Sequence, residues 1–188
     1  IRPDGSGLRR IIPLPVGDTQ ATWLDAPRIS PDGTRVAYTY FRGGTDTRNH
    51  FAGETSALWV ANVDGTHRQR LTPWGQNVGD ADWSPDGMHL AFETLGEHLG
   101  NWASVVTVNA DGSGLRTLTQ DRFTGIGEFY GQGNQQPLYL KSSYDPVYSP
   151  DGTTIMFTHT AYDAPPFVTD LQTMNPDGTQ QTWVSTEG

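Results

Sequence analysis

The side chains best suited to chemistry in this chain are five histidines, yet no pair has the His-x-x-x-His spacing of a helical metal site. His67 and His89 adjoin Asp-Gly turns, where we expect water to surround them. The other three, His50, His98 and His159, fall in or beside separate long connections. They could form a metal or general-base site across those connections, but scattered histidines do not establish the geometry that a site needs.

Other catalytic patterns are missing from the sequence or have a structural explanation. The sequence has no Gly-x-Ser-x-Gly elbow, no phosphate-binding glycine loop and no cysteine. One stretch loosely matches a calcium-binding EF-hand loop through Asp82, Ser84, Asp86, Gly87 and Glu93. Its flanks alternate like strands rather than helices, and its proline and glycine already serve a turn. We therefore interpret the match as a coincidence and predict no catalytic residue, metal ion or cofactor.

Aromatic, arginine and glycine residues are concentrated in two long segments, residues 41–56 and 120–143. Aromatic and arginine side chains are enriched in protein-binding surfaces, and 24 residues is long for a mere connection. We expect the second segment to form an ordered arm, although its aromatics could instead cover the ends of sheets. With Trp102 from a third segment, the predicted partner-binding residues are Phe41, Arg42, Arg48, His50, Phe51, Trp102, Arg122, Phe123, Phe129, Tyr130 and Tyr139.

Seven Asp-Gly turns in two alternating classes indicate the elements that hold these segments in place. Ser-Pro-Asp-Gly begins at Ser30, Ser84 and Ser149. A second class follows at Asp64, Asp111 and Asp177, with a further copy at Asp4. Both classes are typical hairpin turns. The strand after each Ser-Pro-Asp-Gly turn is apolar on both faces, as in Val36, Ala37 and Tyr38, so it should lie between neighbouring sheets.

Each repeat predicts a four-stranded antiparallel sheet, and sheets stacked side by side predict an all-β, partial β-propeller. We expect about three four-stranded blades plus a two-stranded N-terminal remnant. In such a sheet both Asp-Gly turns lie on one rim, and all the long segments lie on the other. Long connections confined to one rim of a rigid scaffold indicate a binding face, or only a cover for the sheet ends.

The motifs also resemble a known family. Ser-Pro-Asp-Gly, an apolar strand, Asn-x-Asp-Gly and then Leu-Thr resemble the WD40-like (PD40) repeat of TolB-like propellers. The pattern is clearest in residues 26–72 and 80–119, while the third copy ends in Val184-Ser185. We therefore predict a single domain over residues 1–188. Its parts are a partial blade at 1–15, blades at 22–72, 80–119 and 144–185, and a long loop or arm at 120–143.

Charge and composition limit the classes of binding partner that we expect. The net charge is −9, and Lys141 is the only lysine, which disfavours nucleic acid and anionic membranes. The negative charge favours a neutral or cationic partner, or it serves only to keep the protein soluble. No stretch has the length of a membrane span. TolB-like proteins are typically exported, so the resemblance implies a periplasmic or extracellular location, and a removed signal peptide before Ile1 would agree with it.

Three blades do not close a propeller, so the predicted fan would expose two sheet faces. The sequence therefore favours a non-enzymatic, protein-binding scaffold subunit that stabilises a larger exported complex, with attachment of that complex to a membrane left open. A protein partner or self-association would complete the open propeller. Two alternatives remain: an enzyme or carbohydrate-processing propeller with a site around His50, His98 and His159, and a fragment of a larger propeller.

Overall fold

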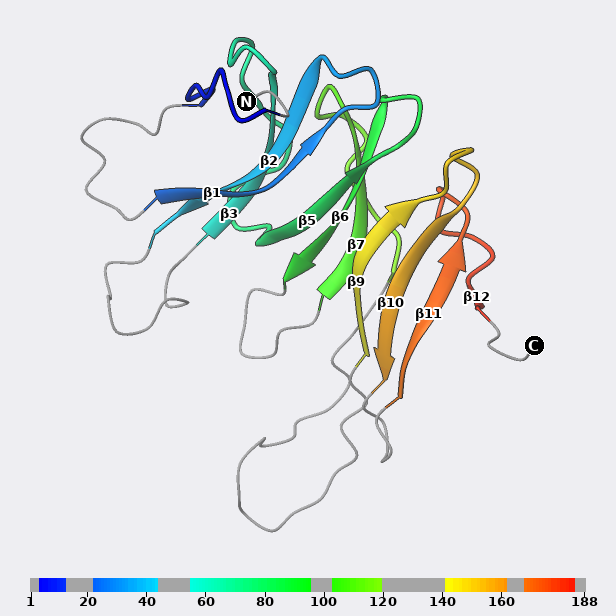
Figure 1. Ribbon diagram of the computed structural model, residues 1–188. Coiled ribbons are helices and arrows are strands. Elements are labelled where there is room, and N and C mark those ends of the chain that lie inside the picture. Colours follow the sequence, from blue (N-terminus) through cyan, green and yellow to red (C-terminus); the bar gives the residue numbers. More distant parts are fainter. Residues whose placement is uncertain are drawn as a thin grey trace.

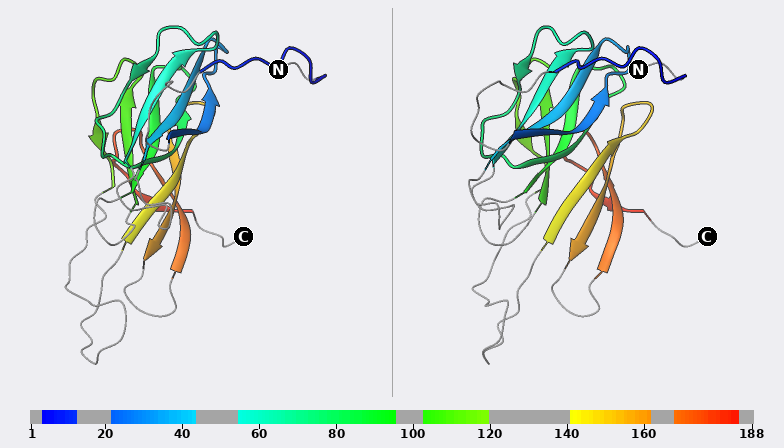
Figure 2. Two further views of the ribbon diagram at one scale, coloured as in Figure 1. Left: turned by 90° about the vertical axis from the view of Figure 1, so that its left-hand side faces the viewer. Right: turned by 60° about the vertical axis from the view of Figure 1, so that its left-hand side comes forward.

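The computed structural model describes residues 4–12, 22–43, 55–95, 103–119, 141–161 and 168–184. These residues form three four-stranded antiparallel sheets that stand side by side as an open fan (Figures 1 and 2). Within each sheet the strands pair in chain order. The predicted fold class, an all-β and unclosed partial propeller, is confirmed. We call the three sheets blades 1, 2 and 3.

The strands of each blade have the following bounds. Blade 1 contains β1 (Thr22–Ile29), β2 (Arg35–Arg42), β3 (Thr55–Asn62) and β4 (Gln69–Arg70). Blade 2 contains β5 (Val78–Trp83), β6 (His89–Leu95), β7 (Ala103–Asn109) and β8 (Arg116–Thr117). Blade 3 contains β9 (Lys141–Tyr148), β10 (Ile155–Ala161), β11 (Val168–Met174) and β12 (Thr182–Trp183).

The Ser-Pro-Asp-Gly turns are held by their own side chains. In blade 1, the Ser30 hydroxyl donates to the Asp32 carboxylate at 2.6 Å, and the Thr34 amide donates to it at 3.0 Å. These bonds, with the Ser30 hydroxyl as the largest cause, lower the pKa of Asp32 to about 2. Gly33 has a φ of 72°, a conformation that glycine adopts without strain. The other two turns repeat these bonds, which explains why one short motif recurs at each blade.

The strand order places the two kinds of connection on opposite rims. Because neighbouring strands are antiparallel, the first and third connections of each blade leave by the same rim. This turn rim, at the top of Figure 1, carries both classes of Asp-Gly turn, as the sequence predicts. We call the opposite rim the loop rim.

The blades pack through two unlike faces. The N-side face of a blade looks toward the preceding blade, and the C-side face looks toward the following one. In the first interface, the C-side face of blade 1 contributes Ala37, Leu58, Val60 and Leu71, and the N-side face of blade 2 contributes Trp83, Leu90 and Phe92. In the second, blade 2 contributes Ala91, Val105 and Leu118, and blade 3 contributes Tyr148, Ile155 and Phe157. The core therefore lies between the blades, as a strand that is apolar on both faces requires.

The N-terminal segment differs from expectation. Residues 4–12 begin with the predicted Asp-Gly turn but form no strand, while residues 1–3 and 13–15 lie outside the described part. The Arg9 guanidinium reaches the Val63 carbonyl at 3.4 Å, and a side chain at Gly65 would collide with the Ile11 carbonyl. A fourth strand needs a third strand beside it, and the described chain provides none here. Ile11 of this segment nevertheless lies against Gly65 of blade 1 in the same way that Leu71 of blade 1 lies against Gly112 of blade 2.

Candidate binding surface

Only two of the predicted partner-binding residues fall within the described chain. Phe41 and Arg42 end β2 at the loop rim. The other nine, which are Arg48, His50, Phe51, Trp102, Arg122, Phe123, Phe129, Tyr130 and Tyr139, lie outside the described residues. Their role stays a prediction.

Phe41 is held on the C-side face of blade 1 by an aromatic partner. Its ring stacks on that of Trp23, with centroids 4.8 Å apart and planes 8° apart. The two residues are direct cross-strand neighbours in β1 and β2, where aromatic pairs stabilise a sheet. Phe41 is half-buried, so it presents part of a fixed aromatic surface rather than a free side chain.

Arg42 belongs to a larger group on the N-side face, which we call the aromatic cluster: Tyr40, Arg42, Trp59, Arg70 and Trp74. The Arg42 and Arg70 guanidinium groups lie 5.1 and 5.7 Å from the Trp74 ring centroid. The Tyr40 ring lies 5.6 Å from Trp74 and 5.9 Å from Trp59. The Trp59 indole N–H is buried and has no hydrogen-bond partner within the described part of the chain. Rigid aromatics beside exposed arginines are typical of protein-binding surfaces.

The sequence analysis did not select Tyr40, Trp59, Arg70 or Trp74. One of them carried a usable signal: Tyr40 follows Tyr38 by two residues, so both face one side of β2. Arg70 pairs with Trp59 across β3 and β4, which requires the register of the folded sheet. Trp74 comes from the connection after β4, and no local pattern places it on this face.

His159 is the one residue of the suggested histidine site that the structure describes. It is buried in β10, where its Nδ1 lies 3.1 Å from the Ser143 hydroxyl of β9. Asp170 pairs with His159 from β11, and both of its carboxylate oxygens are buried without a hydrogen-bond partner within the described ranges. His50 and His98 lie outside those ranges. Among the described residues, no three His, Cys, Asp or Glu side chains gather as a metal site would require.

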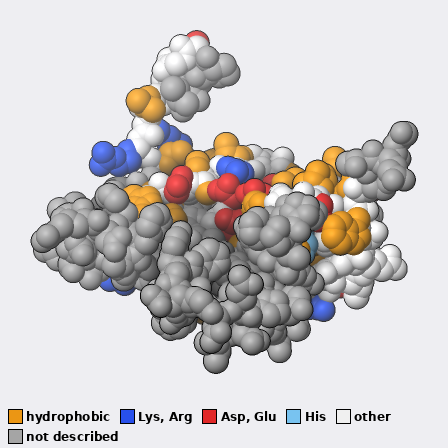
Figure 3. Space-filling view, turned by 90° about the horizontal axis from the view of Figure 1, so that it is seen from below, with side chains coloured by type: hydrophobic (Ala, Val, Ile, Leu, Met, Phe, Trp, Pro, Cys, Tyr) orange, Lys and Arg blue, Asp and Glu red, His pale blue; other side chains and the backbone are white. Residues whose placement is uncertain are grey.

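Acidic side chains lie close together at the loop rim, as Figure 3 shows from below. Glu93 of β6 accepts a hydrogen bond from the Asp145 amide at 2.9 Å, and its side chain lies against Gly79, where a Cβ would collide with it. Burial is the largest cause of a raised pKa for Glu93, and the charges of Asp145 and Asp80 add to it. Arg28 lies 3.9 Å from Asp80. These contacts join β1 to β5 and β6 to β9, and so connect all three blades.

The EF-hand-like residues do not converge. Asp82 accepts a hydrogen bond from the Tyr148 amide at 2.9 Å, and Glu93 accepts one from Asp145. Asp86 stays within its own turn, where Ser84 donates to it. Two of these carboxylates thus fasten blade 3 to blade 2 and the third shapes a turn, which agrees with the interpretation of the match as a coincidence.

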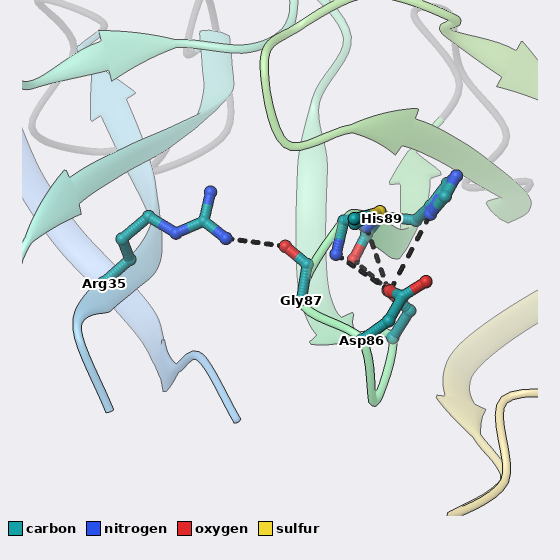
Figure 4. A network of polar contacts seen from close by, with 6 residues as sticks. Arg35, Asp86, Gly87 and His89 are labelled. Atoms are coloured by element: carbon teal, nitrogen blue, oxygen red, sulfur yellow. Dashed lines mark hydrogen bonds and ion pairs between the residues drawn. The ribbon is translucent and has the colours of Figure 1, made fainter. Parts of the chain in front are cut away.

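Polar grooves cross the turn rim between the blades. The groove between blades 1 and 2 has a volume of about 500 Å³ and is lined by Arg35, Met88 and His89, among others. Arg35 crosses it to donate to the Gly87 carbonyl at 2.6 Å, and His89 lies 4.0 Å from Asp86 (Figure 4). The Arg35 guanidinium also lies over the Trp83 ring, so this cation–π contact holds blade 1 against blade 2.

The comparison with curated proteins finds relatives of several kinds, although no family model matches the chain. The chain is 37% identical over 98 residues to Tricorn protease homolog 1 of Streptomyces coelicolor, covering 50% of this chain and 8% of that protein. It is 27% identical over 138 residues to the uncharacterized peptidase YuxL of Bacillus subtilis, covering 70% and 16%. It is 31% identical over 67 residues to the Tol-Pal system protein TolB of Alcanivorax borkumensis, covering 36% and 13%.

Solved structures show the same fold. A putative TolB from Agrobacterium tumefaciens has a TM-score of 0.54 at 22% identity, covering 82% of this chain and 46% of that chain. An oligogalacturonate lyase in complex with manganese has a TM-score of 0.67 at 13% identity, covering 94% and 44%. The β-propeller domain of the Trilobed protease from Pyrococcus furiosus, described as having an open velcro topology, has a TM-score of 0.55 at 11% identity, covering 86% and 41%.

Fold and comparisons together identify the class of protein. Three four-stranded antiparallel blades, stacked face to face, make the chain part of a β-propeller. Over part of its length the sequence is similar to TolB and to a Tricorn protease homolog, and a putative TolB shares the fold. The chain spans at most 16% of the curated relatives that it matches and less than half of the matched structures.

Proposed function

We propose that the chain is a protein-binding scaffold that holds a partner through its open faces and the adjoining loop rim. The observation that carries this proposal is the C-side face of blade 3. Leu171 is 48% exposed there, whereas Leu58 and Val105, at the same position of blades 1 and 2, are fully buried. Apolar surface of this kind is costly to leave in water at roughly 25 cal/mol per Å², so a binding partner stabilises it.

The aromatic cluster supports the same function. Trp74 lies against the exposed arginines of the cluster on the N-side face of blade 1, and Trp23 fixes Phe41 on the opposite face of the same sheet. We propose that the remaining predicted partner-binding residues extend this surface. The likeness to TolB supports an exported location, periplasmic or extracellular, and a place in a larger complex. Within the described ranges, no helix is present that is long and apolar enough to cross a bilayer.

An affinity capture from the organism that encodes the chain tests the proposal. The bait is the chain itself, with Leu171→Asp and Trp74→Ala as disrupting variants. Met88→Asp is the control, because Met88 is an exposed apolar residue that lies on the turn rim. We expect mass spectrometry to find a protein that the unchanged chain and Met88→Asp retain and that at least one disrupting variant loses. If all four baits retain the same proteins, neither surface binds a partner.

An enzymatic function is the second candidate, because a lyase and peptidases share the fold. In this chain the candidate site is the loop rim around His159, with its Ser143 contact, and the two histidines outside the described residues. Replacement of His50, His98 and His159 by alanine should then abolish hydrolase or lyase activity. An activity that survives the triple replacement would exclude this site.

The third candidate is that these blades form part of a larger propeller. It is supported by the finding that the chain covers less than half of each matched structure.

A further inference from the structure

The C-side face of blade 3 repeats the faces that bind a following blade. Met156 stands where blades 1 and 2 have Ala37 and Ala91, and it is 41% exposed whereas both alanines are fully buried. Val184 stands where blade 1 has the buried Leu71, and it is also exposed. The face therefore has the apolar pattern of an inter-blade contact without the blade that would cover it.

Two polar groups of blade 1 recur on this face, although blade 2 has Glu93 and Ala103 at their positions. In blade 1, the Thr39 hydroxyl donates to the Gly79 carbonyl at 2.9 Å, and the Ser56 hydroxyl donates to the Val78 carbonyl at 3.1 Å. These two bonds fix β5 of the next blade against blade 1. In blade 3, cross-strand register places Thr158 and Thr169 at the corresponding positions. Blade 3 thus has hydroxyl groups at both positions, and that of Thr169 would exchange its 3.0 Å contact with the Thr160 hydroxyl for a carbonyl of a following strand.

The N-side face of blade 1 has the positions that, in blades 2 and 3, pack against the C-side face of the preceding blade. Ile29 stands where blades 2 and 3 have Trp83 and Tyr148; it is 67% exposed, whereas both aromatics are buried. In β1, Leu24 and Asp25 stand where β5 has Val78 and Gly79, the residues whose carbonyls accept from blade 1. The buried Trp59 N–H, for which the described residues provide no hydrogen-bond partner, belongs to this face too.

Charge distinguishes the two ends of the fan. Nine of the twelve basic residues precede residue 71, and fourteen of the 21 acidic residues follow it. Residues 1–70, which include the N-terminal segment and nearly all of blade 1, therefore form the basic end of an acidic chain. Opposite charge at the two ends favours approach of one copy's first blade to another copy's last blade, and it opposes contact between like ends.

We propose that the C-side face of blade 3 binds the N-side face of blade 1 of a second copy, head to tail. The inference rests on the proposed function, namely binding through open faces, and it names the partner. In the contact, Thr158 donates to the Asp25 carbonyl and Thr169 to the Leu24 carbonyl of the second copy. Two such contacts would close two copies into a ring of six blades, a number within the range of β-propellers.

The first residues of the chain compete for this contact. Ile11 lies against Gly65 as Leu71 lies against Gly112, so it holds the place that Val184 of the other copy would take. Among the described residues, this segment forms no strand, and its hydrogen bond to blade 1 is the 3.4 Å contact from Arg9. The proposal therefore requires residues 4–12 to leave the face when the second copy binds.

Sedimentation velocity on paired variants tests the proposal. Ile29→Asp removes one half of the contact and Leu171→Asp the other; both positions are exposed, so the single chains should fold, as circular dichroism can verify. We expect each variant alone to be monomeric at concentrations where the unchanged chain and the Met88→Asp control dimerise. An equimolar mixture should dimerise again through the one intact contact. An Ile29→Asp variant that dimerises as well as the unchanged chain, or a mixture that stays monomeric, would overturn the proposal.

Cross-linking gives a second readout that does not depend on the strength of association. The chain has no cysteine, so a disulfide can form only between introduced residues. Leu24 shares the N-side face with Tyr40, so Leu24→Cys with Thr169→Cys in one chain should give covalent dimers under mild oxidation, whereas Leu24→Cys alone should give far fewer. Absence of the covalent dimer would exclude this register. If the unchanged chain is monomeric and fails to cross-link but still captures another protein, the second copy is the wrong partner and the scaffold function stands.

Discussion

At the scale of single residues, charged groups in this fan mostly fasten one blade to the next. Arg35 crosses to the Gly87 carbonyl, Asp82 accepts from Tyr148, and Glu93 accepts from Asp145. Among these groups Glu93 is poorly solvated, and two aspartates lie near it. A carboxylate in such a place costs stability when ionised.

Replacing Glu93 by glutamine should therefore stabilise the fold at neutral pH. The pKa of Glu93 is raised above its ordinary value of 4.5, so the folded state holds this proton more tightly than the unfolded state does. Its ionisation makes stability fall as pH rises from about 4.5 through the raised pKa. Glutamine keeps an acceptor for the Asp145 amide but carries no charge. Thermal unfolding should show Glu93→Gln melting above the unchanged chain at pH 7 and level with it near pH 4. An equal gain at both pH values would mean that charge is not the cause.

At the scale of elements, the strands and blades could be predicted from the sequence because their turns are held locally. The serine and amide bonds to Asp32 need only residues 30–34, so the same motif forms the same hairpin three times. The aromatic cluster was less predictable, because Trp74 reaches Arg42 from a connection after β4. The place of Ile11 against Gly65 also depends on contacts far apart in the chain.

Two leucines at one position of the repeat should differ sharply in their contribution to stability. Leu58→Ala leaves a cavity between blades 1 and 2 and should lower the free energy of unfolding by about 2–5 kcal/mol. Leu171→Ala, at the exposed counterpart, should lower it by about 0.5 kcal/mol or less at protein concentrations too low for association. Urea unfolding of both variants measures the difference. Similar losses would contradict an open C-side face on blade 3.

At the scale of the whole molecule, the chain is a stack of three blades with two unlike outer faces: the C-side face of blade 3 is open, and the N-side face of blade 1 carries residues 4–12. Ile29 and the aromatic cluster mark the basic end, while Met156 and Leu171 mark the other. Each interior interface shows how such faces fit, since both are built from the same positions of the repeat. An open stack of this kind is completed by more blades, and the proposed second copy would supply them.

Thiol labelling tests the open face most directly, because the chain has no cysteine of its own. Single cysteines replace Leu58, Val105 and Leu171, one per protein, and the rate of reaction with a thiol reagent is followed at low protein concentration. The account predicts fast labelling at position 171 and labelling at least about a hundredfold slower at positions 58 and 105, where reaction must wait for local opening. Protection at position 171 should then grow as protein concentration rises. Equal protection of all three positions in the dilute monomer would contradict the open fan.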